Sequence, residues 1–91
     1  MFIGAIDAGG TKVLTAVMTE KGTVLARCQD SVPTANIPAY FRRCAEMLAD
    51  CARDVGVGLE SLDGVGMNIP GMVTPDGRVL GSPSAGWGAF D

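Results

Sequence analysis

Apolar and polar residues alternate with a period of two along the first third of the chain, which is typical of β-strands. Residues 1–7 are apolar at almost every position, as in a strand buried on both faces. Residues 12–19 and 23–30 alternate more regularly. In residues 23–30, the face that carries Val24 and Cys28 is expected to be buried. Short turns separate the three segments, so the pattern predicts three successive antiparallel strands.

The period changes to three and four residues between residues 37 and 55, which predicts an amphipathic helix. Its flanking residues support these limits: Asn36 can cap the first turn, Pro38 needs no backbone N–H there, and Gly56 is typical just after a helix. The apolar stripe expected to face the core consists of Phe41, Cys44, Leu48, Cys51 or Ala52, and Val55. The charged residues on the other side fit a solvated face and need no functional explanation.

Residues 62–69 predict a fourth strand, because apolar residues alternate there with glycines and Asn68. The glycine face would let a helix or a ligand approach closely. A strand reached through a helical crossover is expected to pair in parallel with the first strand. Residues 72–80 follow as a small hairpin around a type I turn that contains Pro75. The expected fold is therefore α/β, in the order β-β-β-α-β with an appended β-hairpin.

Size, charge and cysteine content narrow the class of protein. The chain has 91 residues, enough for one small domain, and its net charge of −3 argues against a nucleic-acid surface. No apolar run approaches the about 20 residues of a membrane span. Three cysteines without a C-x-x-C pair predict reduced thiols in a cytoplasmic protein, and the absence of histidine excludes a histidine-containing zinc site within this chain.

The candidate chemistry lies in the turn between the first two strands, in the run Asp7-Ala8-Gly9-Gly10-Thr11-Lys12. The two glycines can take a positive φ and leave backbone N–H groups uncovered. Thr11 adds a hydroxyl, Lys12 adds a cation, and Asp7 can hold Mg²⁺ directly or through water. A nucleotide-phosphate site needs these groups. The alternative is a plain hairpin whose glycines only make the turn.

Two other phosphate-binding loops do not fit this turn. A Walker A loop and a dinucleotide-binding fingerprint both open a helix, whereas a strand pattern follows this run. The glycine spacing also differs from both motifs. If the turn binds phosphate, it does so as a β-hairpin.

The run resembles the first phosphate motif of the actin-like ATPase superfamily, which includes sugar kinases, Hsp70 and actin. More narrowly, it resembles the start of the ROK (repressor, open reading frame, kinase) sugar kinases, Asp-x-Gly-Gly-Thr-Lys. Residues 64–73, 76–79 and 82–87 are similar to the ROK run of strand, Pro-Gly, hairpin and loop ending in Gly-Trp. The resemblance covers nearly the whole chain and implies an actin-like ATPase (ribonuclease H-like) half-domain.

The resemblance also implies ATP and Mg²⁺ as cofactors and a role for each residue of the turn. Asp7 would hold Mg²⁺ through water; Gly9, Gly10 and Thr11 would contact phosphate. Lys12 would add charge nearby or only cap the hairpin. Two further positions would face the sugar. Gly71 matches a family glycine whose backbone does so, and Ser84 stands where the family often has Asn, which leaves its sugar contact open.

Other parts of the family's site are missing from this chain. No Asn-Asp pair, which carries the family's catalytic Asp, occurs in the sequence, and neither do its Glu-x-x-His motif and cysteine zinc cluster. Asp63 and Asp76 are poor substitutes, at a strand start and in a turn. Residues 1–91 are therefore expected to be the N-terminal part of a ROK-type kinase domain without its C-terminal lobe, with no catalytic residue and no activity when isolated.

The expected function of the full-length parent is ATP-dependent phosphorylation of a sugar, as in a glucokinase or N-acetylmannosamine kinase. Two alternatives remain: the sugar-sensing domain of a ROK-type transcriptional regulator, and a non-catalytic truncated module. Such regulators carry a helix-turn-helix before this domain, so a first strand at residue 1 favours the kinase. One helix covers only one face of a sheet, so a face with Ile3, Leu14 and Ala16 should be partly bare, and a homo-oligomer is expected.

Overall fold

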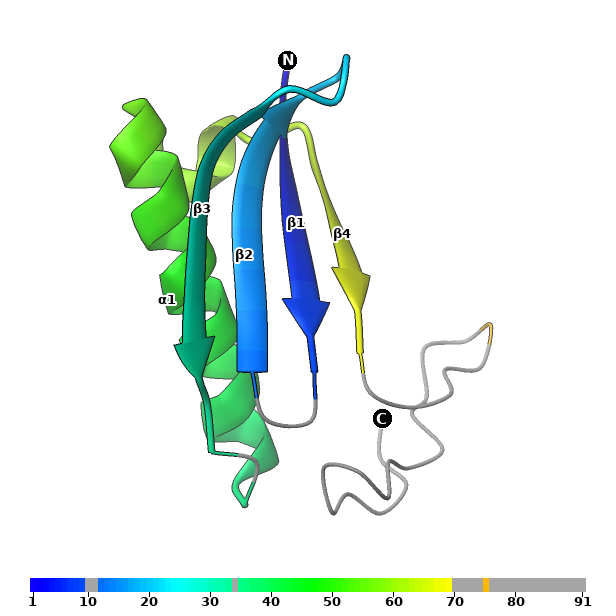
Figure 1. The fold of residues 1–91 in the computed structure, drawn as a ribbon, viewed down its shortest axis with the longest axis vertical. Helices are drawn as coiled ribbons and strands as arrows, with labels where there is room; N and C mark the ends of the chain where they lie inside the picture. Colours follow the sequence, from blue (N-terminus) through cyan, green and yellow to red (C-terminus); the bar gives the residue numbers. More distant parts are fainter. Residues whose placement is uncertain (10–11, 34, 70–74, 76–91) are drawn as a thin grey trace.

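A four-stranded sheet with one long helix on one face forms the part of the chain that the structure describes (Figure 1). The computed structural model describes residues 1–9, 12–33, 35–69 and 75. In chain order the elements are β1 (Phe2–Ala8), β2 (Lys12–Thr19), β3 (Val24–Ser31), α1 (Ile37–Val55), the short 3-10 helix η1 (Leu59–Ser61) and β4 (Gly64–Asn68). The hairpin predicted at residues 72–80 lies outside the described residues, apart from Pro75.

The order of strands in the sheet is β3-β2-β1-β4. The first three strands form the predicted antiparallel meander, and β4 pairs in parallel with β1 as the crossover requires. Both β1 and β4 run toward the same edge of the sheet, so the C-terminal ends of these two strands lie side by side there (Figure 1). The β-β-β-α-β prediction is thus confirmed.

Local capping sets the limits of α1. The Asn36 side chain accepts a hydrogen bond from the Ala39 N–H at 3.0 Å, and Pro38 lies in the first turn. Gly56 ends the helix with φ of 90°, and its N–H bonds to the Ala52 and Arg53 carbonyls. These left-handed angles suit glycine, which has no Cβ to clash with the following carbonyl. The predicted limits of the helix are therefore confirmed at both ends.

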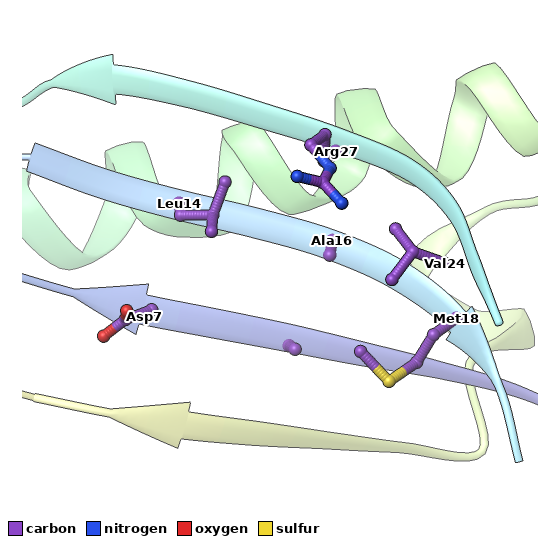
Figure 2. A pocket seen from close by; sticks show the side chains of 7 residues that line it. Asp7, Leu14, Ala16, Met18, Val24 and Arg27 are labelled. Carbon is purple, nitrogen blue, oxygen red and sulfur yellow. The ribbon is translucent and has the colours of Figure 1, made fainter. Parts of the chain in front are cut away.

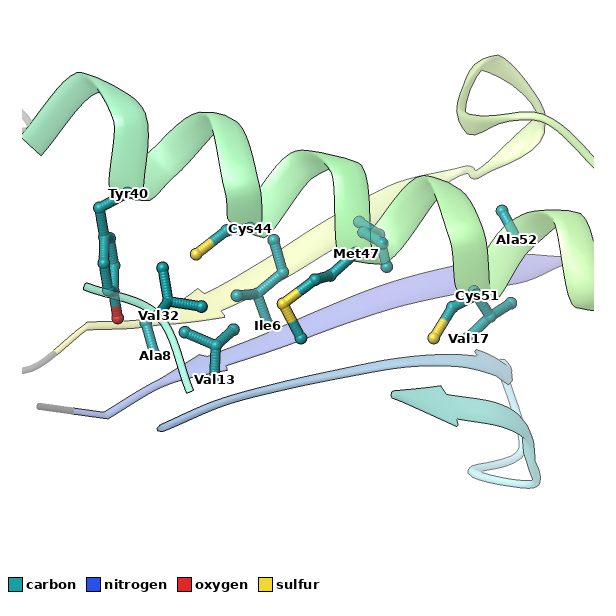
Figure 3. Close-up of a cluster of buried hydrophobic side chains, with 11 residues drawn as sticks. Ile6, Ala8, Val13, Val17, Val32, Tyr40, Cys44, Met47, Cys51 and Ala52 are labelled. Carbon is teal, nitrogen blue, oxygen red and sulfur yellow. The ribbon is translucent and has the colours of Figure 1, made fainter. Parts of the chain in front are cut away.

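The core lies between α1 and one face of the sheet (Figure 3). The helix contributes Tyr40, Cys44, Met47, Leu48, Cys51 and Ala52 as its buried residues. The predicted stripe was therefore slightly misplaced: Phe41 and Val55 are only half-buried, because the sheet meets the helix along the row of Tyr40 and Met47. At Gly4 a Cβ would lie 3.0 Å from side-chain carbons of Leu48 and Leu62, so glycine lets the helix approach β1 closely.

Two strand predictions differ from the structure. The pairing of β2 with β3 shifts by one residue between Val17 and Met18, so Leu25 is an extra residue and Val24 pairs with Met18. This bulge turns Val24 away from the helix, and the prediction that it faces the core was wrong. The fourth strand is also shorter than residues 62–69. The Asp63 side chain and N–H bond to the backbone of Phe2 before the ladder begins.

The other face of the sheet carries no described helix or strand. A shallow depression of about 210 Å³ crosses it and is lined by Ala5, Asp7, Leu14, Ala16, Met18, Val24 and Arg27 (Figure 2). Ile3 and Leu14 are half-buried on this face and Ala16 is buried. We call this surface the open face. Within the described residues, no helix is both long and apolar enough to cross a membrane.

Candidate functional site

Asp7 lies one residue before the end of β1, whereas the sequence predicted it as the last residue of that strand. Its exposed side chain projects from the open face (Figure 2). In the sheet its ladder neighbours are Leu14 on β2 and Asn68 on β4. Lys12 comes two residues before Leu14 on the same strand, so strand alternation places it on this face too. The carboxylate and the cation predicted for the site therefore share one face and one edge of the sheet.

Asn68 is a neighbour of Asp7 that sequence reasoning did not include in the site. It is the last residue of β4, and its side-chain Nδ2 donates a hydrogen bond to Oδ1 of Asp7 at 3.2 Å. The two residues are 61 positions apart in the sequence. The signal that could have found the pair is the predicted parallel pairing, because both residues lie near the C-terminal end of a strand at the same edge.

The turn after β1 closes through the backbone of Gly9, whose N–H donates to the Lys12 carbonyl at 2.8 Å. A Cβ at Gly9 would lie 2.8 Å from this carbonyl oxygen, a distance that real side chains do not tolerate. A positive φ does not explain the need for glycine at position 9, because the glycines with positive φ in the described part are Gly22 and Gly56. Close approach of two backbone segments therefore requires glycine at this position. Gly10 and Thr11 lie outside the described residues.

Tyr40 anchors the turn from the helix side. Its hydroxyl donates to the Gly9 carbonyl at 2.9 Å, and the residue is 1% exposed. Figure 3 shows the ring extending from the first turn of α1 toward Ala8 and Val32. Burial first, and then the nearby Cys44 and Asp7, raise the pKa of the Tyr40 hydroxyl to about 12. The hydroxyl therefore stays protonated, as a donor, at neutral pH.

Tyr40 was also missing from the predicted site, because its role depends on tertiary packing. The sequence shows only an apolar residue one place before the predicted stripe. In the structure its ring packs edge-on against Phe41, with ring centroids 5.5 Å apart. Nothing local in the sequence indicates that its hydroxyl reaches Gly9, 31 residues earlier.

Lys12 opens β2 with an exposed side chain. It lines a polar surface depression with Gln29, Asp30 and Ser31, the end of the neighbouring strand. The described residues contain no group of three or more acidic, cysteine or histidine side chains that could hold a metal. The predicted sugar-facing residues, Gly71 and Ser84, lie outside the described residues.

The side chains of Asp7 and Asn68 suit a hydrated Mg²⁺ ion that also binds a phosphate. Mg²⁺ keeps several of its waters and in nucleotide sites is bound through one or two carboxylates together with substrate phosphates. Asp7 is an exposed carboxylate with Oδ1 already accepting from Asn68. It can hold a hydrated ion beside a phosphate, whereas a metal enclosed by protein ligands alone would need more donors than these residues offer.

Comparison with solved structures assigns the fold. The ROK family glucokinase of Streptomyces griseus, solved with glucose and AMPPNP, is similar with a TM-score of 0.63 and 26% identity, over 99% of this chain and 27% of that one. A protein from Cytophaga hutchinsonii gives a TM-score of 0.73 over 98% of this chain and 29% of its own, at 21% identity, which supports the fold alone. The described strands and helix thus belong to the actin-like ATPase fold.

Sequence comparison narrows this class to one family. The sequence model of the ROK family matches residues 3–91, and the chain belongs to the ROK family. It is 34% identical over 74 residues to the N-acetylmannosamine kinases of three strains of Vibrio cholerae serotype O1. That match covers 80% of this chain and 23% of each relative. The chain therefore spans about a quarter of the length of the curated relatives that it matches.

Proposed function

We propose that this chain is the N-terminal, phosphate-binding part of an ATP-dependent sugar kinase. The single observation that carries the proposal is the position of Asp7. Its exposed carboxylate stands near the C-terminal end of β1, close to Gly9, whose N–H bonds to the Lys12 carbonyl and whose carbonyl accepts from Tyr40. A carboxylate next to a glycine backbone that no side chain covers suits a polyphosphate carrying Mg²⁺. In the full-length parent, residues 1–91 would form the N-terminal part of the kinase domain, and the catalytic base would come from a C-terminal lobe.

Each residue of the turn has a proposed role. Asp7 holds Mg²⁺ through water; Gly9, Gly10 and Thr11 contact phosphate; Lys12 adds positive charge nearby. The N–H of Gly9 is used within the hairpin, and its missing Cβ leaves room for the Lys12 carbonyl, so Gly9 contributes by closing the hairpin tightly. When bound, Mg²⁺ neutralises charge that develops on the transferred phosphoryl group.

The proposed substrate is a hexose or an N-acetylated amino sugar. The relatives include N-acetylmannosamine kinases, and a solved relative is a glucokinase bound to glucose. On the family pattern, Gly71 would face the sugar, and so would position 84, where this chain has Ser and the family often has Asn. The free cysteines Cys28, Cys44 and Cys51 fit a reducing, cytoplasmic setting for the enzyme. Residues deciding between the sugars would lie in the remaining three quarters of such a kinase.

Nucleotide binding by the chain itself tests the proposal. We would titrate the ¹⁵N-labelled 91-residue chain with AMPPNP, with and without Mg²⁺, and follow the amide resonances near Asp7. The expected result is weak, saturable binding that needs Mg²⁺ and is strongly reduced in Asp7→Asn. If the affinity for AMPPNP is the same with and without Mg²⁺ and in Asp7→Asn, the turn is a plain hairpin.

A catalytic assay gives a second test. The isolated chain should not phosphorylate glucose or N-acetylmannosamine, because it lacks a general base, whose loss typically costs about 10²–10⁴ in rate, and most of a nucleotide site. Saturable, ATP-dependent phosphorylation of either sugar by the purified chain would contradict the assignment as an incomplete kinase.

A further inference from the structure

The pair formed by Asp7 and Asn68 is a cross-strand contact at the edge where β1 and β4 end. The parallel register places the two residues opposite each other, and strand alternation points both side chains to the open face. Nδ2 of Asn68 donates to Oδ1 of Asp7 at 3.2 Å. The structure therefore joins the proposed Mg²⁺ carboxylate to a strand that follows it by 61 residues.

The contact is not explained by the stability of the fold. Asn68 is exposed, as is every other residue of β4, and Asp7 is exposed as well. A hydrogen bond between two solvated side chains exchanges water for protein and adds little net stability. A side chain that contributes little to the core but orients a functional carboxylate is better explained by what that carboxylate does.

The chemistry of a carboxamide suits this position. An Asn side chain is neutral, so it holds the carboxylate without cancelling the negative charge that attracts a cation. A Lys or Arg at position 68 would donate equally well but would compete with Mg²⁺ for Asp7. Once Nδ2 has donated to Asp7, the carbonyl oxygen of Asn68 is still an acceptor, of the kind that binds water molecules carried by Mg²⁺.

We infer that Asn68 is a positioning residue of the magnesium–phosphate site. It fixes the Asp7 carboxylate through Oδ1 and leaves Oδ2 for the hydrated ion. This inference rests on the proposed function, because it assigns Asp7 the role of holding Mg²⁺. Partners that orient a ligating group typically change metal affinity by about 10–100-fold when they are removed.

The test compares three variants of the 91-residue chain. Asn68→Ala removes the donor, Asp7→Asn removes the carboxylate, and Gln29→Ala is the matched control. Gln29 is an exposed polar residue on the open face. Leu14 on β2 pairs with Asp7 on one side and with Gln29 on the other, so Gln29 lies level with Asp7 but two strands away. For each variant the Mg²⁺ concentration at half-maximal AMPPNP binding is measured by NMR, together with the midpoint of thermal unfolding.

We expect Asn68→Ala to raise the Mg²⁺ midpoint about 10-fold or more with an unchanged unfolding midpoint, and Gln29→Ala to change neither. If Asn68→Ala behaves like Gln29→Ala while Asp7→Asn loses Mg²⁺-dependent binding, the inference about Asn68 is wrong and the proposed function stands. If Asp7→Asn binds like the natural chain, or if the natural chain does not bind Mg²⁺ and AMPPNP, both are overturned. A loss in Asn68→Ala accompanied by a matching fall in the unfolding midpoint would assign Asn68 a structural role instead.

Discussion

Gly9 shows at the scale of one residue how the turn after β1 depends on the absence of a side chain. Changing Gly9→Ala would place a Cβ 2.8 Å from the Lys12 carbonyl oxygen, against backbone that cannot move away easily. We expect Gly9→Ala to destabilise the chain by about 1–3 kcal/mol, the usual cost of forcing an extra methyl into a packed site. Urea unfolding at neutral pH measures this difference.

Gly66→Ala is the control for this substitution. A Cβ at Gly66 meets no described atom within 4 Å, so the variant should unfold at nearly the same urea concentration as the natural chain. Equal destabilisation by the two substitutions would mean that loss of glycine in a strand region, and not the contact with Lys12, is the cause.

Tyr40 makes the free energy of unfolding depend on pH in the alkaline range. Its pKa rises from an ordinary value of 10.0 to about 12 in the folded chain, mainly through burial. Between these two values the unfolded chain has lost a proton that the folded chain keeps, so stability falls as pH rises. The expected slope is about 1.4 kcal/mol per pH unit.

Tyr40→Phe isolates this contribution. The variant loses the bond to Gly9 and should be less stable by about 0.5–1.5 kcal/mol at pH 7. It should also show a shallower loss between pH 10 and 12. Burial raises the pKa of Cys44 and Cys51 too, so both chains lose some stability above the ordinary thiol value. Parallel unfolding profiles for the two chains over this range would rule out the role of Tyr40.

At the scale of one element, α1 shows what local sequence can specify. Asn36→Ala removes the acceptor for the Ala39 N–H, and helix caps of this kind contribute about 1 kcal/mol. We expect a loss of that size in thermal unfolding followed by circular dichroism, and a smaller loss for Asn36→Asp, which keeps an acceptor oxygen. Equal losses in both variants would contradict the capping role.

The helix was predictable because its signals lie within it: a cap, a proline in the first turn and a terminal glycine. The positions of the first three strands followed from alternation and short turns. The bulge at Leu25 was not predictable, because the alternation of residues 23–30 fits either register equally well. Tyr40 and Asn68 were missed for a related reason. Each acts on a residue far away in the sequence, and only the packing of α1 and the pairing of β4 bring them to the turn.

At the scale of the whole molecule, the open face determines how the isolated chain should behave in solution. The described elements leave apolar residues such as Ile3 and Leu14 half-buried on it, around the depression of about 210 Å³. Burial of apolar surface yields about 25 cal/mol per Å², so a partner covering several hundred Å² could offset part of the cost of association. We therefore expect the purified chain to form a homodimer or a larger assembly.

Light scattering across a range of protein concentrations checks this expectation, with Leu14→Lys as the variant that should shift the mass toward the monomer. A monomer mass that does not change up to high micromolar concentration would count against association through the open face.

The exposure of β4 affects how persistent the contact between Asn68 and Asp7 is. Its five residues are all exposed, and its described backbone partner is β1 alone. Strands with few buried contacts open locally at a lower free energy than the core, so amide protons of β4 should exchange with solvent faster than those of β2. The contact between the Tyr40 hydroxyl and the Gly9 carbonyl lies beside the buried core and does not involve β4. Asn68 lies on β4, so each opening of that strand would release the Asp7 carboxylate while the contact between Tyr40 and Gly9 stays in place.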